Sequence, residues 1–320
     1  MLAPISRRTF LSHSAVGVSA LLAGSSLRAT DAQPSTQITM LSDMAGSDFE
    51  QAARRHAELG LKWLDLRNAL WGETINNLSL ANARRVADIA RDHGLSVFCL
   101  STSLCLSNLE DGEAAFRKRH LPALDHVLKI AGILQPQRIR MLSAAVKPFP
   151  TDEPVMALVE RKHAWVFGAY REMIDRMVGS GQRVLIENEA SNAIFSRPGD
   201  IVRFFKILER HDMVRCTWDT QNLWQMGVFP TMEVYRTLKP LIGCLHLKGG
   251  RTKGDGKALV WASALEDASW AVAEIVRAAV ADGVAPFICI NTSHGKRPPG
   301  FDPWMVAQRD IAFLRKTLGA

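Results

Sequence analysis

Short apolar runs alternate with longer amphipathic segments from residue 37 to residue 318. The short runs are rich in β-branched and aromatic residues, whereas the longer ones carry apolar residues at helical spacing, and several end at a glycine, such as Gly60 or Gly94. Strands are expected at Gln37–Leu41, Leu61–Arg67, Leu95–Leu100, Arg138–Leu142, Arg183–Glu187, Val214–Asp219, Ile242–Leu247 and Phe287–Asn291. Helices are expected at Asp48–Leu59, Leu80–His93, Glu113–Ala131, Val155–Gly179, Ile201–His211, Thr231–Leu238, Leu265–Ala281 and Pro303–Leu318.

This alternation of strand and helix indicates parallel βα units, and eight such units close most naturally into a barrel. An open, doubly wound sheet is the alternative, but no expected strand is followed by a Gly-x-Gly-x-x-Gly turn. No linker or low-complexity segment divides the chain after residue 32. We therefore expect α/β architecture, with residues 33–320 forming a single (β/α)8 TIM barrel.

The first 32 residues have a different character. Ser6-Arg7-Arg8-Thr9-Phe10-Leu11 leads into an apolar run from Ala15 to Gly24, which is the pattern of a cleavable twin-arginine (Tat) export signal. A membrane helix is the alternative, but this run is about half of the roughly 20 residues that a hydrocarbon core requires. We therefore expect residues 1–32 to be a Tat signal peptide. The mature protein would be periplasmic or otherwise exported, with the Tat machinery as a partner and no stable membrane insertion.

Replacing Arg7 and Arg8 by lysine should keep the precursor in the cytoplasm, because the twin-arginine pair is what the export receptor recognises. Fractionation of cells that express either the wild type or the double variant measures this. N-terminal sequencing of the exported wild type should place the mature start near Gln33. Efficient export of the double variant would contradict the assignment.

The charge and the cysteines add little to this picture, apart from one basic cluster. The formal net charge is +7, and charges of both signs alternate along the expected helices, as is typical of solvated faces. The five cysteines lack Cys-x-x-Cys spacing, which favours buried thiols over disulfides.

The basic cluster follows the last two expected strands and comprises Lys248, Arg251, Lys253, Lys257, Lys296 and Arg297. Barrel enzymes often bind phosphate there, so this cluster favours an anionic or strongly polar substrate over solvated loop charge alone.

The last four expected strands have a polar side chain at or next to their carboxyl ends, namely Glu187, Asp219, His246 and Asn291. Active sites of (β/α)8 barrels lie at the carboxyl ends of the strands. Two carboxylates, an imidazole and an amide oxygen form a mixed ligand set suited to Mn, Mg, Co or Zn. Each residue alone could be an ordinary strand end that is hydrogen-bonded to loop backbone. Their equivalent places on four successive strands favour one shared divalent metal ion.

These strand ends lie in the segments IENEA, WDTQN, LHLKGGR and ICINTSHG. On these segments the chain resembles the xylose isomerase-like barrels, the superfamily of sugar phosphate isomerases and epimerases that also includes endonuclease IV. The resemblance implies that Glu187, Asp219 and His246 hold the metal ion. It places Asn291 where epimerases of the group have a second glutamate that binds metal and moves a proton. Asparagine offers a carbonyl oxygen but cannot act as a base, so a symmetric two-base epimerisation is not expected.

Further polar and aromatic residues are expected around the metal ligands. Glu187 or Glu189 would move a proton, Lys248 would polarise a carbonyl or stabilise an enolate oxygen, and His294 would supply a further acid or base. Solvated loop positions are the alternative for Lys248 and His294. Substrate contacts are expected from Trp71, Trp224, Trp261, Arg251, Lys296 and Arg297. The aromatic residues would stack on a sugar face, although each could instead anchor a loop.

We expect a divalent-metal-dependent enzyme that acts on a carbohydrate or keto-sugar. The resemblance implies isomerisation or epimerisation, and export favours free, oxidised or keto sugars and a related elimination. A non-catalytic sugar-binding barrel with a degenerate metal site is the alternative that Asn291 supports, although the retained Glu187 and Asp219 argue against it. A phosphodiesterase like endonuclease IV needs three zinc ions, and too few histidines lie near the strand ends. Nucleic acid is therefore not expected as a partner.

Overall fold

Eight parallel strands form a closed barrel in the computed structural model, which describes residues 36–253, 258–261, 263–292 and 299–319. The barrel strands are β1 (Gln37–Leu41), β2 (Trp63–Leu66), β3 (Ser96–Ser101), β4 (Arg138–Leu142), β5 (Arg183–Glu187), β6 (Val214–Asp219), β7 (Ile242–Leu247) and β10 (Phe287–Ile290). Their order around the barrel is β1-β10-β7-β6-β5-β4-β3-β2. The expected (β/α)8 TIM barrel is confirmed.

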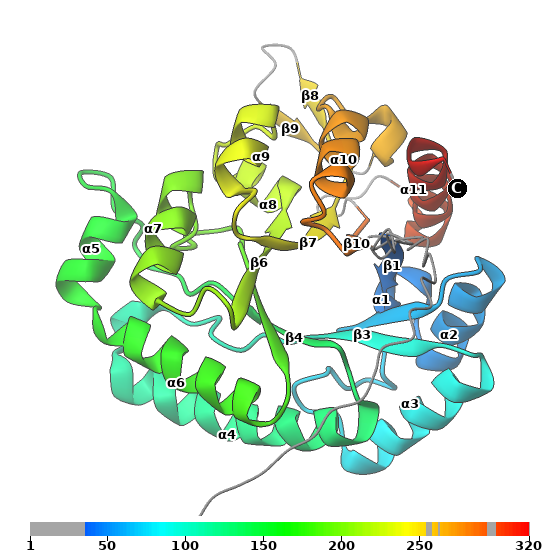
Figure 1. Ribbon diagram of the computed structural model, residues 1–320, viewed down its shortest axis with the longest axis horizontal. Coiled ribbons are helices and arrows are strands. Elements are labelled where there is room, and N and C mark those ends of the chain that lie inside the picture. Colours follow the sequence, from blue (N-terminus) through cyan, green and yellow to red (C-terminus); the bar gives the residue numbers. More distant parts are fainter. Residues whose placement is uncertain (1–35, 254–257, 262, 293–298, 320) are drawn as a thin grey trace, which may run out of the picture. The chain divides into compact units, whose positions relative to one another are not determined.

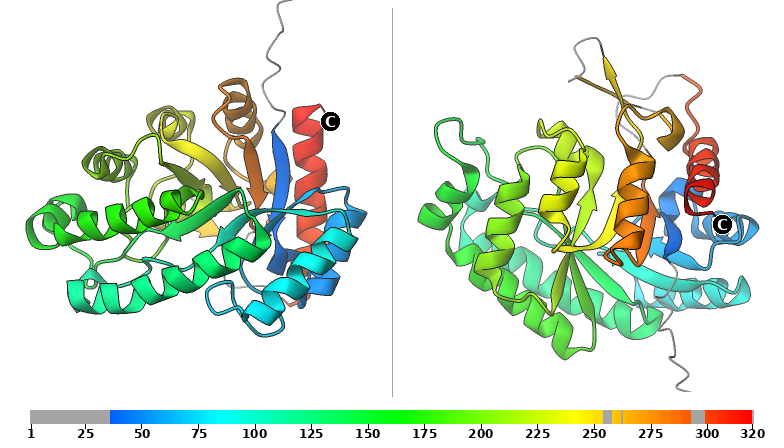
Figure 2. Two further views of the ribbon diagram at one scale, coloured as in Figure 1. Left: turned by 60° about the horizontal axis from the view of Figure 1, so that its bottom comes forward. Right: turned by 45° about the horizontal axis from the view of Figure 1, so that its top comes forward.

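Helices surround the strands, as Figures 1 and 2 show. The longer ones are α2 (Phe49–Glu58), α3 (Leu80–Asp92), α4 (Glu113–Leu134), α5 (Val155–Lys162), α6 (Trp165–Gly179), α7 (Pro198–Leu208), α9 (Met232–Leu238), α10 (Val272–Ala281) and α11 (Pro303–Leu318). Short elements in the loops are α1 (Ser42–Ala45), η1 (Leu109–Asp111), α8 (Thr220–Gln225) and η2 (Leu265–Asp267), with a hairpin of β8 (Arg251–Lys253) and β9 (Ala258–Val260). Most expected boundaries agree within about one helical turn.

Two expected helices are shorter than the sequence pattern predicts. The helix expected over residues 155–179 is divided, because His163 leaves helical geometry at φ −126° and its Nε2 lies 3.1 Å from Glu110 Oε1. The helix expected from Leu265 begins only at Val272, and the preceding η2 is held by α11, where Asp310 Oδ1 accepts the Leu265 N–H at 2.6 Å. Both interruptions come from contacts distant in sequence.

Aromatic side chains pack together near the amino ends of some barrel strands, and small side chains lie higher up in the interior. Phe287 begins β10 and stacks on Phe98, with ring centroids 3.8 Å apart. Above it, the buried residues Thr217, Cys244 and Cys289 lie two positions before Asp219, His246 and Asn291, respectively. All five cysteines are buried and free, as expected. Small side chains at this level leave space above them for a site at the carboxyl ends.

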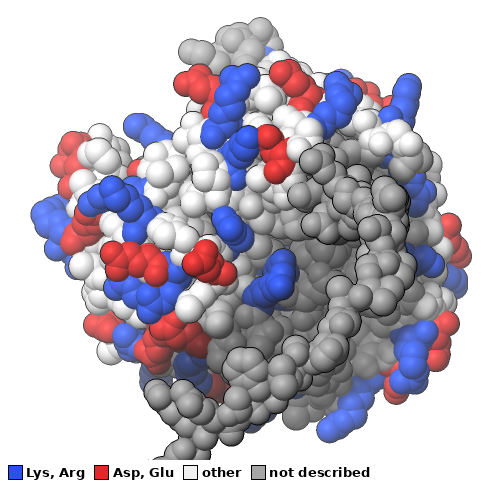
Figure 3. All heavy atoms as spheres, in the orientation of Figure 1, with Lys and Arg blue, Asp and Glu red and all other residues white. Residues whose placement is uncertain are grey.

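The described surface has no marked charge segregation on the face drawn in Figure 3, where basic and acidic side chains are interspersed. This agrees with the interpretation of the helix charges as solvated faces. Within the described ranges, no helix is both long enough and apolar enough to cross a bilayer.

Candidate active site

The strand ends bring three of the four expected metal ligands into one buried group. Asp219 on β6 pairs in register with His246 on β7, and Glu187 ends the neighbouring strand β5. Ligand atoms of these three residues all lie within 4.8 Å of one another, and none of the three is more than 3% exposed. Asn291 follows β10 and places its Nδ2 3.5 Å from Asp219 Oδ2. The expected convergence at the barrel mouth is therefore present.

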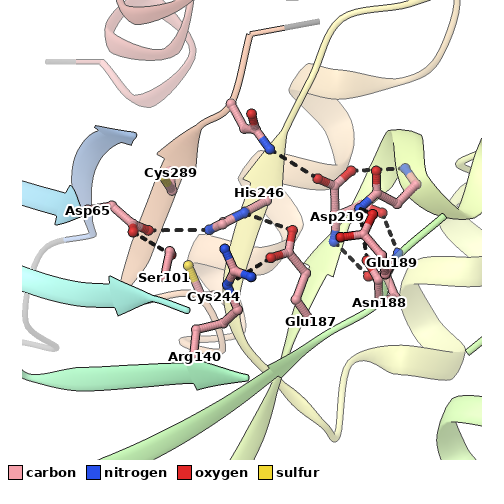
Figure 4. A network of polar contacts seen from close by, with 12 residues as sticks. Asp65, Ser101, Arg140, Glu187, Asn188, Glu189, Asp219, Cys244, His246 and Cys289 are labelled. Atoms are coloured by element: carbon pink, nitrogen blue, oxygen red, sulfur yellow. Dashed lines mark hydrogen bonds and ion pairs between the residues drawn. The ribbon is translucent and has the colours of Figure 1, made fainter. Parts of the chain in front are cut away.

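His246 lies between two carboxylates that reach it from opposite sides (Figure 4). Its Nδ1 is 3.0 Å from Glu187 Oε1, and its Nε2 is 3.4 Å from Asp65 Oδ2. Burial disfavours a charged imidazole, but the Glu187 carboxylate, together with Asp65 and the other neighbours of the ring, raises the pKa of His246 well above its usual value. In this state His246 is an imidazolium that donates a hydrogen bond to Glu187 and forms a longer ion pair with Asp65.

Arg140 on β4 completes this buried charge network from the other side of Glu187. Its Nε is 2.9 Å from Glu187 Oε2, and its Nη1 donates to the Thr102 carbonyl oxygen at 2.9 Å. Burial would raise the pKa of Glu187, but the charges of Arg140 and His246 hold it below its usual range. Glu187 is thus ionised, and both its oxygens have a cationic partner.

Three residues of the buried charge network come from the first half of the barrel and are absent from the sequence-based prediction of the site. They are Asp65 on β2, Ser101 on β3 and Arg140 on β4, and Ser101 Oγ donates to Asp65 Oδ1 at 2.5 Å. A signal was available, because each is a polar residue next to apolar residues in a strand that the sequence predicts. A polar side chain in a buried barrel strand must face a polar interior.

Asp219 is held by backbone and side-chain contacts at the start of α8. Its Oδ1 accepts the N–H groups of Gln221 and Asn222 at 3.1 and 2.9 Å. The Asn188 side chain donates to the Asp219 carbonyl oxygen and accepts its N–H, both at 2.8 Å. The other carboxylate oxygen, Oδ2, is 2.8 Å from Lys248 Nζ. Asp219 is therefore fixed in place, with Oδ2 directed at a cation.

Glu189 and Lys248 are both connected to Asn222. Glu189 Oε1 accepts from the Ala190 N–H at 2.9 Å and from Asn222 Nδ2 at 3.3 Å. Lys248 Nζ donates to Asn222 Oδ1 at 2.9 Å. Burial and then the nearby Glu187 carboxylate raise the pKa of Glu189. Among the described residues, Glu189 Oε2 accepts no hydrogen bond, so one oxygen is anchored and the other is available to a ligand.

A cavity of about 860 Å³ opens above these residues. Of the residues expected to act on or bind substrate, those that line it are Glu187, Glu189, Lys248, Asn291 and Trp261. Asp219 and His246 lie beneath its floor, with exposed fractions of 0% and 1%. The site thus has a lower layer with Asp219 and His246 and an upper layer in which Glu189 and Lys248 line the cavity.

Three other expected substrate contacts, Trp71, Trp224 and Arg251, lie away from this cavity. The Trp71 indole donates to Glu50 at 2.6 Å and packs beneath the Arg85 guanidinium, 4.0 Å from the ring centroid. Trp224 is buried beside Phe229, and Arg251 is exposed on the β8–β9 hairpin. Neither tryptophan lines the cavity, and Arg251 does not either. His294, Lys296 and Arg297 lie outside the described residues, as does Lys257.

The donor set fits one divalent metal ion. Glu187, Asp219 and His246 offer two carboxylates and an imidazole nitrogen, and the buried Oδ1 of Asn291 has no hydrogen-bond partner in the described part of the chain. If His246 binds through Nδ1, its Nε2–H remains directed at Asp65, which is a common orienting contact for a metal-binding histidine. A metal ion would compete with Lys248 for Asp219. Its binding to His246 Nδ1 would also break the hydrogen bond between His246 and Glu187.

A second group of potential ligands, Asp65, His246 and Cys289, shares His246 with the first. Burial raises the pKa of the Cys289 thiol. Metal binding requires the thiolate, so this group is the weaker candidate.

Comparison with known proteins places this geometry in context. A family model described as xylose isomerase-like TIM barrel matches residues 53–316. A search of curated protein sequences finds no match. The solved structures that the chain resembles include a xylose isomerase-like TIM barrel protein from Mycobacterium smegmatis in complex with magnesium, with 18% identity, a TM-score of 0.64, and coverage of 89% of this chain and 96% of that one.

Two further solved structures have similar folds. One is a probable 3-DHS dehydratase from Bacillus anthracis involved in petrobactin synthesis, with 14% identity, a TM-score of 0.64, and coverage of 87% of this chain and 98% of that one. The other is a 3-keto-D-glucoside 4-epimerase from E. coli, with 13% identity, a TM-score of 0.63, and coverage of 88% and 99%. At such identities the likeness shows a common fold.

Proposed function

Because the chain belongs to the xylose isomerase-like TIM barrel family, we propose that it is a divalent-metal-dependent enzyme that moves a proton at a carbon beside a carbonyl group of a carbohydrate. The main support for this proposal is the position of Glu189. Its uncommitted carboxylate oxygen lines the same cavity as Lys248 and stands above the metal-ligand set. A base, an electrophilic group and a metal site at the mouth of the barrel are the groups that catalyse such a proton transfer.

The metal ion, held by Glu187, Asp219, His246 and Asn291, would supply Lewis-acid polarisation of a substrate oxygen when bound. Manganese, magnesium, cobalt and zinc all suit this mixed set of oxygen and nitrogen ligands. The magnesium complex of the like-folded mycobacterial protein supports a divalent ion at this place in the fold.

Glu189 is a better base than Glu187 in this arrangement. Both Glu187 oxygens already face cations, from His246 and Arg140, and such a carboxylate is a weak proton acceptor. Glu189 lacks a cationic partner as close as these, and its Oε2 is open to the cavity. We therefore assign proton abstraction to Glu189 Oε2.

Lys248 would stabilise the oxygen that becomes negatively charged when the proton leaves. Its ammonium group has three N–H donors, two of which are directed at Asp219 and Asn222. The third can donate to a substrate oxygen in the cavity. Because Asn222 contacts both Glu189 and Lys248, it fixes the base relative to the electrophilic group.

Because Asn291 cannot accept a proton, Glu189 is the carboxylate base that we propose, and a second acid or base would have to come from His294. Glu189 can remove a proton and return it on the same face of the sugar, as an isomerisation requires, or it can begin an elimination. An inverting epimerisation needs a second acid on the opposite face, and His294 is the residue that we propose for that role. A dehydratase and a keto-glucoside epimerase among the like-folded structures are compatible with either outcome.

We also propose that the protein acts outside the cytoplasm, on the strength of the Arg7-Arg8 export signal. Free, oxidised or keto sugars are then better candidate substrates than phosphorylated metabolites of the cytoplasm. Trp261 lines the cavity and is the aromatic residue that we propose to contact the sugar.

Replacing Asn291 by glutamate should lower the native reaction several-fold. The new carboxylate would lie beside Asp219, with Lys248 the nearest compensating cation. Its negative charge would raise the pKa of a neighbouring carboxyl group and draw Lys248 away from the substrate. Wild type and variant are assayed on ketoses, uronates and 3-keto-glycosides with added manganese.

The same assay separates a specialised site from a degenerate one. Arg140 and Lys248 already neutralise two metal ligands, which is the observation that favours a non-catalytic sugar-binding barrel. An inactive wild type with an active Asn291→Glu variant would support that alternative and contradict our proposal.

A further inference from the structure

The wall of the cavity opposite Lys248 contains unpaired cations. The basic residues that line the cavity are Arg67, Arg119, Arg140, Lys147 and Lys248. Arg67 is paired with Asp43 at 2.6 Å, and Arg140 and Lys248 are paired with metal ligands. Within the described ranges, Arg119 and Lys147 form no ion pair. These two residues come from the segments that follow β3 and β4, and β3 is opposite β7 in the barrel order.

The segments that carry this wall are held together by hydrogen bonds between them. The Ala145 N–H donates to the Ser107 carbonyl oxygen at 2.9 Å, and the Leu109 N–H donates to the Ala145 carbonyl oxygen at 2.8 Å. Asn108 Oδ1 accepts the Lys147 N–H at 2.9 Å. The backbone around Ser107 and Lys147 is therefore fixed before any ligand binds.

Ser107 presents a hydroxyl proton that lacks an acceptor. His120 Nδ1 accepts the Cys105 N–H at 3.2 Å, so this nitrogen carries no proton. Burial and then the charge of Arg119 lower the pKa of His120 to about 4, so the neutral ring carries its proton on Nε2. Nε2 lies 2.7 Å from Ser107 Oγ and donates to it, and Arg119 Nη1 donates to the same oxygen at 3.2 Å.

Both lone pairs of Ser107 Oγ are thus occupied, and its own proton must be donated elsewhere. Ser107 is 8% exposed and lines the cavity. No acceptor for this proton is present in the part of the chain that the structure describes. A buried donor without an acceptor carries a free-energy cost that a ligand oxygen would remove.

We propose that Ser107, Arg119 and Lys147 form a subsite for an oxyanion, a carboxylate or a phosphate, at the end of the substrate remote from Lys248. The inference rests on the proposed function and adds that the substrate is an acidic sugar. All three groups are donors and two are cations, so an acceptor with negative charge satisfies them together. Asp111 lines the same cavity. Its negative charge and the two positive charges of Arg119 and Lys147 give this group of residues a net charge of +1.

This subsite differs from the anion-binding loops that the sequence predicts. The expected cluster follows β7 and β10, where Arg251 is exposed and outside the cavity. The subsite instead uses the segments after β3 and β4. His120 acts as a positioning residue, because its Nε2–H occupies one lone pair of Ser107 and directs the hydroxyl proton away from the ring.

Calorimetric titration of the mature protein with D-glucuronate, D-glucose 6-phosphate and D-glucose at equal ionic strength tests the subsite. We expect at least one of the two anions to bind about ten-fold or more tightly than glucose, because charged hydrogen bonds would be gained. A preference for glucuronate identifies the group as a carboxylate, and a preference for glucose 6-phosphate identifies it as a phosphate. Ser107→Ala and Arg119→Gln should each reduce this preference about ten-fold, because each removes a donor to the anion.

Arg54→Gln is the matched control, because it removes the same charge from an exposed residue of α2 and should leave the preference intact. Arg119 is exposed, so Arg119→Gln keeps the test valid if Ser107→Ala fails to fold. Binding is measured without turnover, so a failed proton-transfer assay does not affect it. Equal affinities for all three sugars, no binding of either anion, or a preference that survives both substitutions would overturn the subsite.

Discussion

Replacing Glu189 by glutamine should lower the rate of proton transfer at the substrate carbon by at least about a hundred-fold, because general bases typically contribute that much. Glutamine keeps an oxygen that can accept the hydrogen bonds of Ala190 and Asn222, so the loop should retain its geometry. It cannot accept a proton from carbon. The measurement is the exchange rate of the substrate proton with solvent at saturating sugar and metal.

Glu172→Gln is a suitable control, since Glu172 is on α6 and pairs with Arg117 outside the cavity. This control should retain the wild-type rate. Metal content should be the same in the wild type, Glu189→Gln and the control. Equal exchange rates in the wild type and Glu189→Gln would show that Glu189 is not the base, and Glu187 or His294 would then have to be tested.

The second large effect concerns the metal ligands. Glu187→Gln, Asp219→Asn and His246→Ala should each lower divalent-metal occupancy by about ten-fold or more, because each removes a direct ligand. Elemental analysis of each purified variant after equilibration with manganese measures this. The wild type should hold about one ion per chain, whereas about three would favour a nuclease-like zinc cluster.

Asp175→Asn provides the matched control, because Asp175 is paired with Arg210 on the exterior. Each variant is also checked for folding by circular dichroism, because Glu187 and His246 are members of a buried charge network. Full metal content in all three folded variants would mean that no metal centre exists here. Glu187 and Asp219 would then serve only as partners for Arg140 and Lys248.

The fold could be predicted because its determinants are local. Strand and helix periods are visible in any window of the sequence, and five of the eight expected barrel strands have the observed boundaries. The break at His163 and the late start of α10 could not be predicted. They depend on Glu110 and Asp310, which are distant in sequence from the segments that they alter.

The candidate site could be predicted to the extent that its residues are strand ends. Glu187, Asp219, His246 and Asn291 share one position in the βα repeat, so topology alone brings them together. Arg140 and Asp65 lie on strands that have no such polar end. Asp65 meets His246 across the barrel, whereas Arg140 meets Glu187 of the neighbouring strand β5, and neither pairing follows from the sequence pattern. The oxyanion subsite depends on the direction of single hydrogen bonds around Ser107, which no sequence pattern encodes.

The reaction proposed for this site is the transfer of a proton at a carbon beside a carbonyl group. The most direct measurement incubates the metal-loaded wild type in D₂O with ketoses, uronates and 3-keto-glycosides and follows deuterium incorporation by NMR. We expect metal-dependent deuterium incorporation at the carbon adjacent to the carbonyl of at least one sugar, and we expect Glu189→Gln to abolish it. A folded wild type with about one bound metal ion that incorporates no deuterium into any of these sugars would contradict it.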